Sequence, residues 1–185
     1  MVPMNVENTR LSGVLLIHPE VHRDDRGYFA EVFRSQEFAD HGIGPEFVQE
    51  NVSGSKGGVL RGLHYQICRP QGKLIRVTSG SLYDVAVDLR RSSKTFGEWQ
   101  GFELSADKPT LLWIPVGFAH GYFVLSSWAE LQYKVTDTYD PACERTLQWD
   151  DPSVGVAWPI PPGTKPIMSE RDTQGLGLGD LDLFE

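Results

Sequence analysis

Short runs of β-branched and aromatic residues recur along the chain, and most of them are bounded by Gly, Pro, Asp or Ser. We interpret these runs as strands, because such residues fit the pleated, half-buried surface of a sheet. The predicted strands span residues 12–19, 27–33, 46–53, 58–66, 73–90, 98–105, 110–117, 120–126 and 129–139. Many short strands at this spacing are typical of a β-sandwich or a small barrel.

The clearest alternation lies in residues 81–90, where Asp84 and Asp88 fall on one face and the aliphatic residues between them on the other. We interpret both aspartates as structural. One short helix is predicted at 35–44, with Ser35 as its N-cap and Gly42 as its terminator.

The composition of the chain changes after Asp150, where it becomes rich in proline and then in glycine. Residues 151–185 are therefore predicted to form an irregular segment packed over the core. The sequence holds no internal repeat and no low-complexity linker. We expect a single domain of residues 1–185, with a barrel core at about 24–150.

Length and charge narrow the classes of function. The 185 residues, 40% of them hydrophobic, can bury one good core. No apolar run approaches the roughly 20 residues of a membrane helix, so we expect a cytoplasmic protein. A net charge of −8 argues against nucleic acid or a membrane as partner, because both are bound by clustered Lys and Arg. Cys68 and Cys143 form no CxxC pair, and we expect reduced thiols.

Two histidines lie in strand-like runs beside small residues. Gly58 is followed after five residues by His64, and His120 ends the string Pro-Val-Gly-Phe-Ala-His. A lone histidine in a strand is more often a core residue bonded to a carbonyl, but two of them favour a shared pocket. This skeleton resembles metal-binding cupins, yet Gln66 stands at the place of their second histidine and no carboxylate follows. Two imidazoles are a poor transition-metal site, so we expect a cupin-like barrel without a metal.

An ordered set of strings makes the resemblance more specific. From about Asp24 to Asp172 the chain reads DRGYFAE, FVQENVS, GVLRGLHYQ, QGKLIRV, DVAVDLRRSSKTFGEW, IPVGFAHGY, YKVTDTYDPACE, WDDPSVGVAWP and SERD. In order and spacing this resembles the dTDP-4-dehydrorhamnose 3,5-epimerases of dTDP-L-rhamnose synthesis. The resemblance implies an all-β fold, a cupin-type jelly-roll barrel with short helices. It also implies inversion of C3 and C5 beside the C4 ketone of a dTDP-4-keto-6-deoxy sugar, without cofactor.

The resemblance assigns four catalytic residues. Inversion beside a ketone needs a base on one face, an acid on the other and a group that stabilises the enolate. By resemblance His64 is the base, and Asp172 orients its ring and stabilises the imidazolium. Tyr133 is the acid, since a phenol with a pKa of ~10 keeps its proton at neutral pH. Lys73 places a positive charge beside the enolate oxygen.

The same resemblance assigns the substrate-binding residues. They are Arg26, Phe29, Glu31, Gln49, Asn51, Arg61, Lys73, His120, Tyr139, Glu144 and Arg171, with Tyr139 stacking on thymine. Arginine forks fit two phosphate oxygens at once. Strict alternation would place Arg61 and His64 on opposite faces, so a bulge or twist is expected near Gly62.

Family members are homodimers whose N-terminal strands cross to the partner, which implies that Arg26 and Glu31 serve the neighbouring site. Arg171 stands where lysine is common, so the contacts to the diphosphate can differ there.

Three alternatives stay open at this stage. The nearest is a mono-epimerase of an antibiotic-sugar pathway, which inverts only one carbon. A metal-dependent cupin enzyme predicts bound iron or zinc and loss of activity with a chelator. A non-catalytic sugar-nucleotide binding module predicts no solvent exchange at either carbon. Read singly, the charged and polar residues named above are more often structural, and it is their joint order that favours the enzyme.

Overall fold

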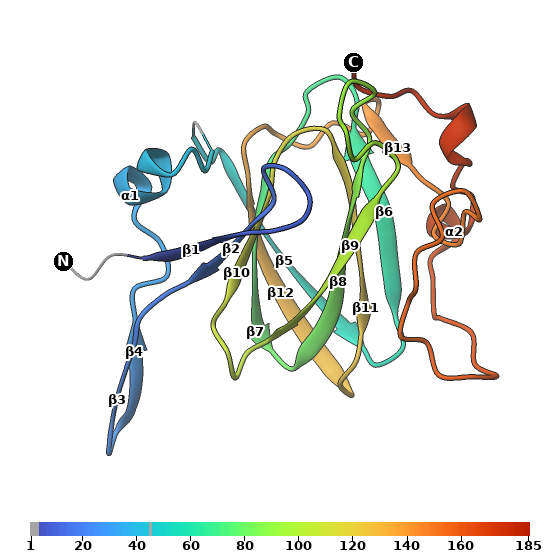
Figure 1. Ribbon diagram of the computed structural model, residues 1–185. Coiled ribbons are helices and arrows are strands. Elements are labelled where there is room, and N and C mark those ends of the chain that lie inside the picture. The colour runs from blue at the N-terminus through green and yellow to red at the C-terminus, as the bar shows by residue number, and fades with distance from the viewer. Residues whose placement is uncertain (1–3, 45) are drawn as a thin grey trace.

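The computed structural model describes residues 4–44 and 46–185, and within them the chain is built mainly of short antiparallel strands (Figure 1). The strands are β1 (Asn5–Asn8), β2 (Leu15–His18), β3 (Val21–Asp24), β4 (Gly27–Ala30), β5 (Gln49–Lys56), β6 (Leu60–Gln66), β7 (Lys73–Ser79), β8 (Ser81–Asp88), β9 (Trp99–Ser105), β10 (Leu111–Ile114), β11 (Phe118–Val124), β12 (Trp128–Val135) and β13 (Glu144–Thr146). The helices are α1 (Ser35–Asp40), α2 (Glu170–Thr173) and the 3₁₀ turn η1 (Leu178–Asp180).

Two sheets form the barrel. One has the strand order β1-β2-β10-β7-β12-β5 and the other the order β13-β6-β11-β8-β9, while β3 and β4 form a separate hairpin. In Figure 1 this hairpin extends away from the barrel. Neighbours in each sheet are mostly distant in sequence, which is the mark of jelly-roll connectivity. The prediction of an all-β jelly-roll barrel is confirmed.

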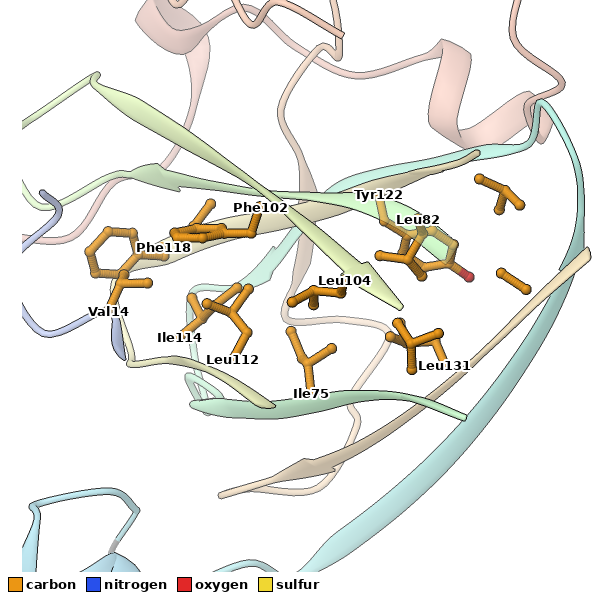
Figure 2. Packing of buried hydrophobic residues seen from close by; sticks show 14 of the residues in the cluster. Val14, Ile75, Leu82, Phe102, Leu104, Leu112, Ile114, Phe118, Tyr122 and Leu131 are labelled. Carbon is orange, nitrogen blue, oxygen red and sulfur yellow. The ribbon is translucent and has the colours of Figure 1, made fainter. Parts of the chain in front are cut away.

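The main core lies between the two sheets (Figure 2). Ile75 and Leu112 come from the first sheet and meet Leu82, Phe102 and Tyr122 from the second. Each fully buried aliphatic side chain of this kind contributes about 1.5–3 kcal/mol to folding. The inward residues of β7, β8, β10 and β11 therefore fix the spacing of the sheets and so the width of the barrel.

Strand β8 is buried on both faces. Leu82 and Ala86 face the main core, whereas Val85 and Val87 pack in a second cluster with residues of the C-terminal segment such as Leu181. The prediction that residues 151–185 pack irregularly over the core is thus confirmed, because the described chain there contains only α2, η1 and loops. This segment covers the outer face of the second sheet and places α2 against the middle of β6.

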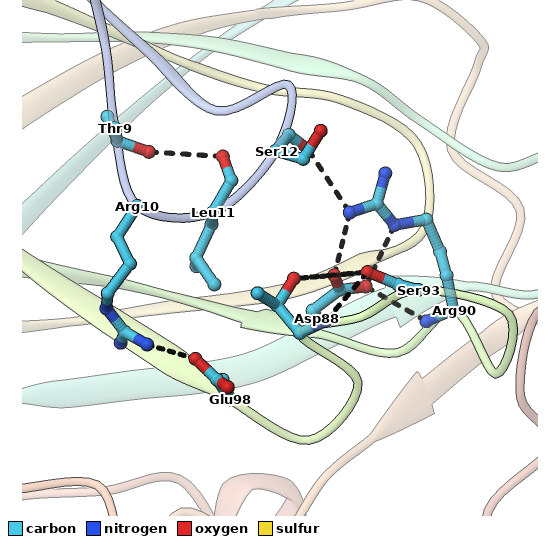
Figure 3. Close-up of polar contacts among 9 residues, drawn as sticks. Thr9, Arg10, Leu11, Ser12, Asp88, Arg90, Ser93 and Glu98 are labelled. Carbon is cyan, nitrogen blue, oxygen red and sulfur yellow. Dashed lines mark hydrogen bonds and ion pairs between the residues drawn. The ribbon is translucent and has the colours of Figure 1, made fainter.

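The buried carboxylate of Asp88 has the structural role expected of it (Figure 3). It accepts hydrogen bonds from Arg90, Ser93 and Thr95 at 2.7–2.8 Å, and Arg90 also donates to the carbonyl of Ser12. Burial raises the pKa of Asp88, but these hydrogen bonds outweigh it and hold the pKa below the usual value. The cluster ties the loop after β8 to the loop before β2.

Several element boundaries differ from the prediction. The run 73–90 is two strands, β7 and β8, joined at Gly80, which has a φ of +70°. Helix α1 begins at Ser35 instead of being capped by it. Arg34 holds the N-cap position without a side-chain hydrogen bond, so that prediction was wrong. Gly42 does end the helical turn, with a φ of +71°.

The expectation of reduced thiols was wrong, because Cys68 and Cys143 form a disulfide. Strand β13 pairs antiparallel with β6, with Glu144 opposite Gln66, and this register brings the Cα atoms of the two cysteines to 5.1 Å. The two cysteines are 75 residues apart in the sequence, so no local pattern indicated that they lie close together. Among the described helices, none has the length and apolar character needed to cross a membrane.

Candidate active site

A cavity of about 390 Å³ opens between the two sheets. Ten of the predicted site residues line it, namely Gln49, Asn51, Arg61, His64, Lys73, His120, Tyr133, Tyr139, Glu144 and Arg171. They come from β5, β6, β7, β11, β12, β13, α2 and the loop after β12. The cavity wall also contains Ser53, Gln71, Gly121, Tyr122 and Leu131, which sequence reasoning missed. A concave site with convergent polar groups of this size is typical of small-ligand binding.

His64 and Asp172 form a pair at the wall of this cavity. The His64 Nε2 atom lies 2.6 Å from Asp172 Oδ1, although its N–H does not point straight at that oxygen. Asp172 is also the third residue of a capping box in α2, where it accepts a hydrogen bond from the Ser169 hydroxyl at 2.6 Å. Burial raises the pKa of Asp172, but the close contact with His64 and the hydrogen bond from Ser169 prevail and lower that pKa to about 2. The carboxylate is thus ionised at neutral pH and can only accept.

An irregularity in β6 brings Arg61 and His64 to the same cavity. Across the β6–β11 pair His120 lies opposite His64 and Tyr122 opposite Arg61, so three steps on β6 match two on β11. The predicted bulge near Gly62 is confirmed. A Cβ atom on Gly62 would lie 2.5 Å from the Cα of Gly121, so the close approach of the two strands requires glycine there.

Lys73 and Tyr133 stand on neighbouring strands of the first sheet, β7 and β12. Lys73 donates from Nζ to the carbonyl of His64 at 3.2 Å and is surrounded by protein atoms, although part of its surface faces the cavity. Burial lowers the pKa of Lys73 to about 8, which Glu144 and Asp84 only partly counteract. Burial likewise raises the pKa of Tyr133, so its phenol keeps the proton at neutral pH.

A second buried pair, which the sequence analysis did not identify, lies at the cavity wall, where His120 is one of the lining residues. His120 Nε2 lies 2.9 Å from Asp84 Oδ2, and both side chains are almost fully buried. Burial raises the pKa of Asp84 and lowers that of His120, because it disfavours the charged form of each, and their mutual contact opposes both shifts. The only signal in the sequence was an aspartate in an otherwise apolar strand, and we had interpreted Asp84 as structural.

Three predicted residues form a polar cluster at the cavity. The Tyr139 hydroxyl donates to Glu144 at 2.6 Å, and Arg171 forms an ion pair with Glu144. The backbone N–H of Tyr139 donates to Gln49 Oε1 at 3.0 Å. The hydrogen bond to Glu144 raises the pKa of Tyr139. This cluster links β13, α2 and the loop after β12.

Gln66, at the place of a cupin metal ligand, has a different use in this fold. Its Nε2 donates to the carbonyls of Arg69 and Thr138, and its Oε1 accepts the N–H of Asp140 at 2.7 Å. The Gln66 amide therefore holds the loop after β6 and the loop after β12 in place. In residues 4–44 and 46–185 no group of three or more His, Cys, Asp or Glu side chains is arranged to hold a metal ion.

Three predicted binding residues lie outside the cavity of the single chain. Arg26 is at the tip of the β3–β4 hairpin, where it pairs with Asp24, and Phe29 is 68% exposed. Glu31 follows β4 and pairs with Arg34. Within one chain none of the three meets His64 or its neighbours.

The comparisons with known proteins agree with one another. A family model described as dTDP-4-dehydrorhamnose 3,5-epimerase matches residues 8–180. A curated dTDP-4-dehydrorhamnose 3,5-epimerase of Pseudomonas aeruginosa is 48% identical over 182 residues, which cover 98% of this chain and 99% of that protein. The crystal structure of the Legionella pneumophila dTDP-6-deoxy-D-glucose-3,5-epimerase, in complex with dTDP-4-keto-L-rhamnose, has a TM-score of 0.92 and 43% identity, covering 97% of this chain and 95% of that one.

A more distant structure represents the mono-epimerases. The 3′-monoepimerase ChmJ of Streptomyces bikiniensis, in complex with dTDP-quinovose, has 33% identity and a TM-score of 0.83, covering 97% of this chain and 88% of that one. Both 3,5-epimerases are more similar to this chain in sequence than ChmJ, and the Legionella structure also has the higher TM-score. With the fold, the cavity and a match over nearly its whole length, this chain belongs to the dTDP-4-dehydrorhamnose 3,5-epimerase family.

Proposed function

We propose that His64, Tyr133, Lys73 and Asp172 carry out the family reaction, the epimerisation of dTDP-4-dehydro-6-deoxy-D-glucose at C3 and C5 to dTDP-4-dehydro-L-rhamnose. The observation that carries the proposal is the position of the acid and the base. His64 belongs to the second sheet and Tyr133 to the first, so they reach the one cavity from opposite walls. Inversion of a carbon requires a proton to leave on one face and to arrive on the other.

His64 acts as the base through Nδ1. The Asp172 carboxylate lies at Nε2 and can only accept, so it holds the ring proton there and leaves the lone pair on Nδ1. When Nδ1 takes a proton from the sugar, the adjacent carboxylate stabilises the imidazolium. Lys73 carries a positive charge at pH 7 and stabilises the enolate oxygen, and Tyr133 then donates its proton to the carbon.

The diphosphate is bound by Arg61. Among the ion pairs of the described residues, Arg26 and Arg171 each have a carboxylate partner, whereas Arg61 has none. A guanidinium at the cavity without a carboxylate partner is suited to two phosphate oxygens. Tyr139 stacks on the thymine base, Glu144 and Arg171 hold its position, and Gln49, Asn51 and His120 bind the remaining polar groups.

A second copy of the chain completes the site. Arg26, Phe29 and Glu31 were predicted to bind substrate, yet none of them lines the cavity of its own chain, and the hairpin that carries Arg26 and Phe29 extends away from the barrel (Figure 1). A homodimer that exchanges its N-terminal strands would place them at the partner's cavity and would cover exposed aromatic surface on the hairpin.

Solvent exchange tests the proposed reaction. We expect incubation with the 4-keto-6-deoxyglucose nucleotide in D₂O to introduce deuterium at both C3 and C5, as detected by NMR. Addition of a 4-ketoreductase with NADPH should then give the L-rhamno product. Deuterium confined to one carbon would move the chain to the mono-epimerases, and exchange at neither carbon would favour a binding module.

A further inference from the structure

Three hydroxyl groups that the mechanism above does not use connect Arg61 to the cavity wall. The Arg61 Nε atom donates to Ser55 Oγ at 3.0 Å. The Tyr122 hydroxyl lies 3.3 Å from Ser55 Oγ and 2.9 Å from Ser53 Oγ. Both serines are on β5 in the first sheet and Tyr122 is on β11 in the second, so the chain of hydrogen bonds crosses the barrel.

The chemistry of the four groups sets the direction of these hydrogen bonds. A guanidinium has only donors, so Ser55 Oγ must accept from Arg61. Ser55 is buried, and among the described residues the Tyr122 hydroxyl is the other hydrogen-bond partner of its side chain. A buried hydroxyl hydrogen seeks an acceptor, so Ser55 donates to Tyr122, and Tyr122 donates to Ser53.

This direction leaves one donor at the end of the chain. Ser53 accepts from Tyr122 and lines the cavity, so its hydroxyl hydrogen is available to a ligand. At the other end, the hydrogen bond from Arg61 Nε to Ser55 orients the guanidinium. Both terminal nitrogens of Arg61 stay available to a ligand. The two ends therefore present donors to oxygen atoms of a bound molecule.

We infer that Ser53, Ser55 and Tyr122 belong to the substrate site, Ser55 and Tyr122 as positioning residues for Arg61 and Ser53 as a direct hydrogen-bond donor to a phosphate or sugar oxygen. The inference rests on the proposed role of Arg61 in binding the diphosphate. A side chain held in its binding conformation loses less entropy when the ligand arrives, so the chain of hydroxyls raises affinity without touching the reacting carbons.

A double-mutant cycle with dTDP as the probe tests the positioning role. We expect Ser55→Ala to weaken dTDP binding about five- to tenfold, the usual size for the net contribution of a single hydrogen bond. The same substitution in an Arg61→Ala background should have no further effect, because the group that Ser55 positions is gone. Ser55→Thr keeps the hydroxyl and should restore most of the affinity. The kcat value of each Ser55 variant should stay within about twofold of the parent enzyme, because the reacting groups are unchanged.

Tyr122 and Ser53 provide independent tests. Tyr122→Phe keeps the ring in the core and removes only the hydroxyl, so it should weaken dTDP binding while Tyr83→Phe, a matched change on β8 outside the cavity, should not. Ser53→Ala should raise the Kd for dTDP if its partner is a phosphate oxygen, or only the KM for the sugar nucleotide if its partner is a sugar oxygen.

The outcomes separate this inference from the proposed function. Unchanged dTDP affinity in Arg61→Ala alone would refute the diphosphate role of Arg61, and the inference with it. If Arg61→Ala weakens binding but Ser55→Ala acts equally in both backgrounds, or not at all, the positioning role is wrong. No change in either Kd or KM for Ser53→Ala would remove Ser53 from the site.

Discussion

At the scale of single residues, the proposed mechanism gives His64 and Asp172 different parts in one proton transfer. In it the Asp172 carboxylate fixes the ring tautomer and the His64 imidazole takes the proton, so substitutions of the two residues should lower kcat by different amounts. We expect His64→Ala to lower kcat by about 10²–10⁴-fold and Asp172→Asn by less. The Kd for dTDP should change less than about threefold in both, because neither residue is assigned to the nucleotide. Near-normal turnover by His64→Ala would refute its role.

The charge on Lys73 should make the activity depend on pH in a range that can be measured. Its pKa is lowered by burial to about 8, so the positive charge is present at neutral pH and is lost as the pH rises through that value. If this charge stabilises the enolate, kcat/KM should fall on the alkaline side with an apparent pKa of about 8. Tyr133 cannot cause this limb, because its pKa is raised above its ordinary value.

Arginine at position 73 provides the control, since it stays protonated through this range. Lys73→Arg should be slower than the parent enzyme but should lack the limb near pH 8. Profiles of kcat/KM against pH for both proteins check this, with circular dichroism at each pH to show that the fold is intact. An unchanged limb in Lys73→Arg would assign the titration to another group.

At the scale of elements, the sequence predicted most of the strands, and ten of the predicted site residues line one cavity. Alternation and flanking turn residues marked β6 and β8, and the conflict between alternation and the family resemblance at Arg61 and His64 predicted the bulge in β6. The short strands β1, β3 and β13 were not predicted, because three or four residues with few apolar side chains carry no detectable period.

Strand pairing that the sequence analysis did not predict explains the errors at the site. Asp84 meets His120 only through the register of β8 with β11, and Cys68 meets Cys143 only through β13 and β6. Such contacts depend on long-range strand pairing, which local patterns do not encode. The hydroxyls of Ser53 and Tyr122 likewise come together across two sheets. The sequence shows which polar residues stand at these positions, but it does not show which residues they contact in the fold.

The attachment of β13 to β6 can be tested directly, because the disulfide lies beside this strand pair. It closes a loop of 75 residues, so its removal should lower the free energy of unfolding by about 2–4 kcal/mol. We expect Cys68→Ser to show this loss in urea denaturation, and a reductant should destabilise the parent protein but leave Cys68→Ser unchanged. If reductant does not shift the midpoint of the parent protein, the two thiols are not bonded in solution.

At the scale of the whole molecule, the hairpin of β3 and β4 is the feature that a single chain does not explain. Its tip carries Arg26, 89% of whose side chain is exposed, and Phe29 is also largely exposed. If these residues serve the cavity of a second copy, the site is shared between subunits. A substitution in the hairpin would then impair the site of the partner subunit, whereas a substitution in the cavity would impair the site of its own subunit.

Subunit mixing tests this arrangement. We expect His64→Ala and Arg26→Ala to be poorly active alone, and a mixture allowed to exchange subunits to recover activity at about a quarter of the sites. Random pairing makes half of the dimers mixed, and each mixed dimer then holds one site with both residues intact. The matched control is His64→Ala mixed with Lys73→Ala, whose mixed dimers damage both sites and should recover nothing. If the first mixture stays as inactive as the control, Arg26 acts within its own chain or not at all, and the exchanged dimer is wrong.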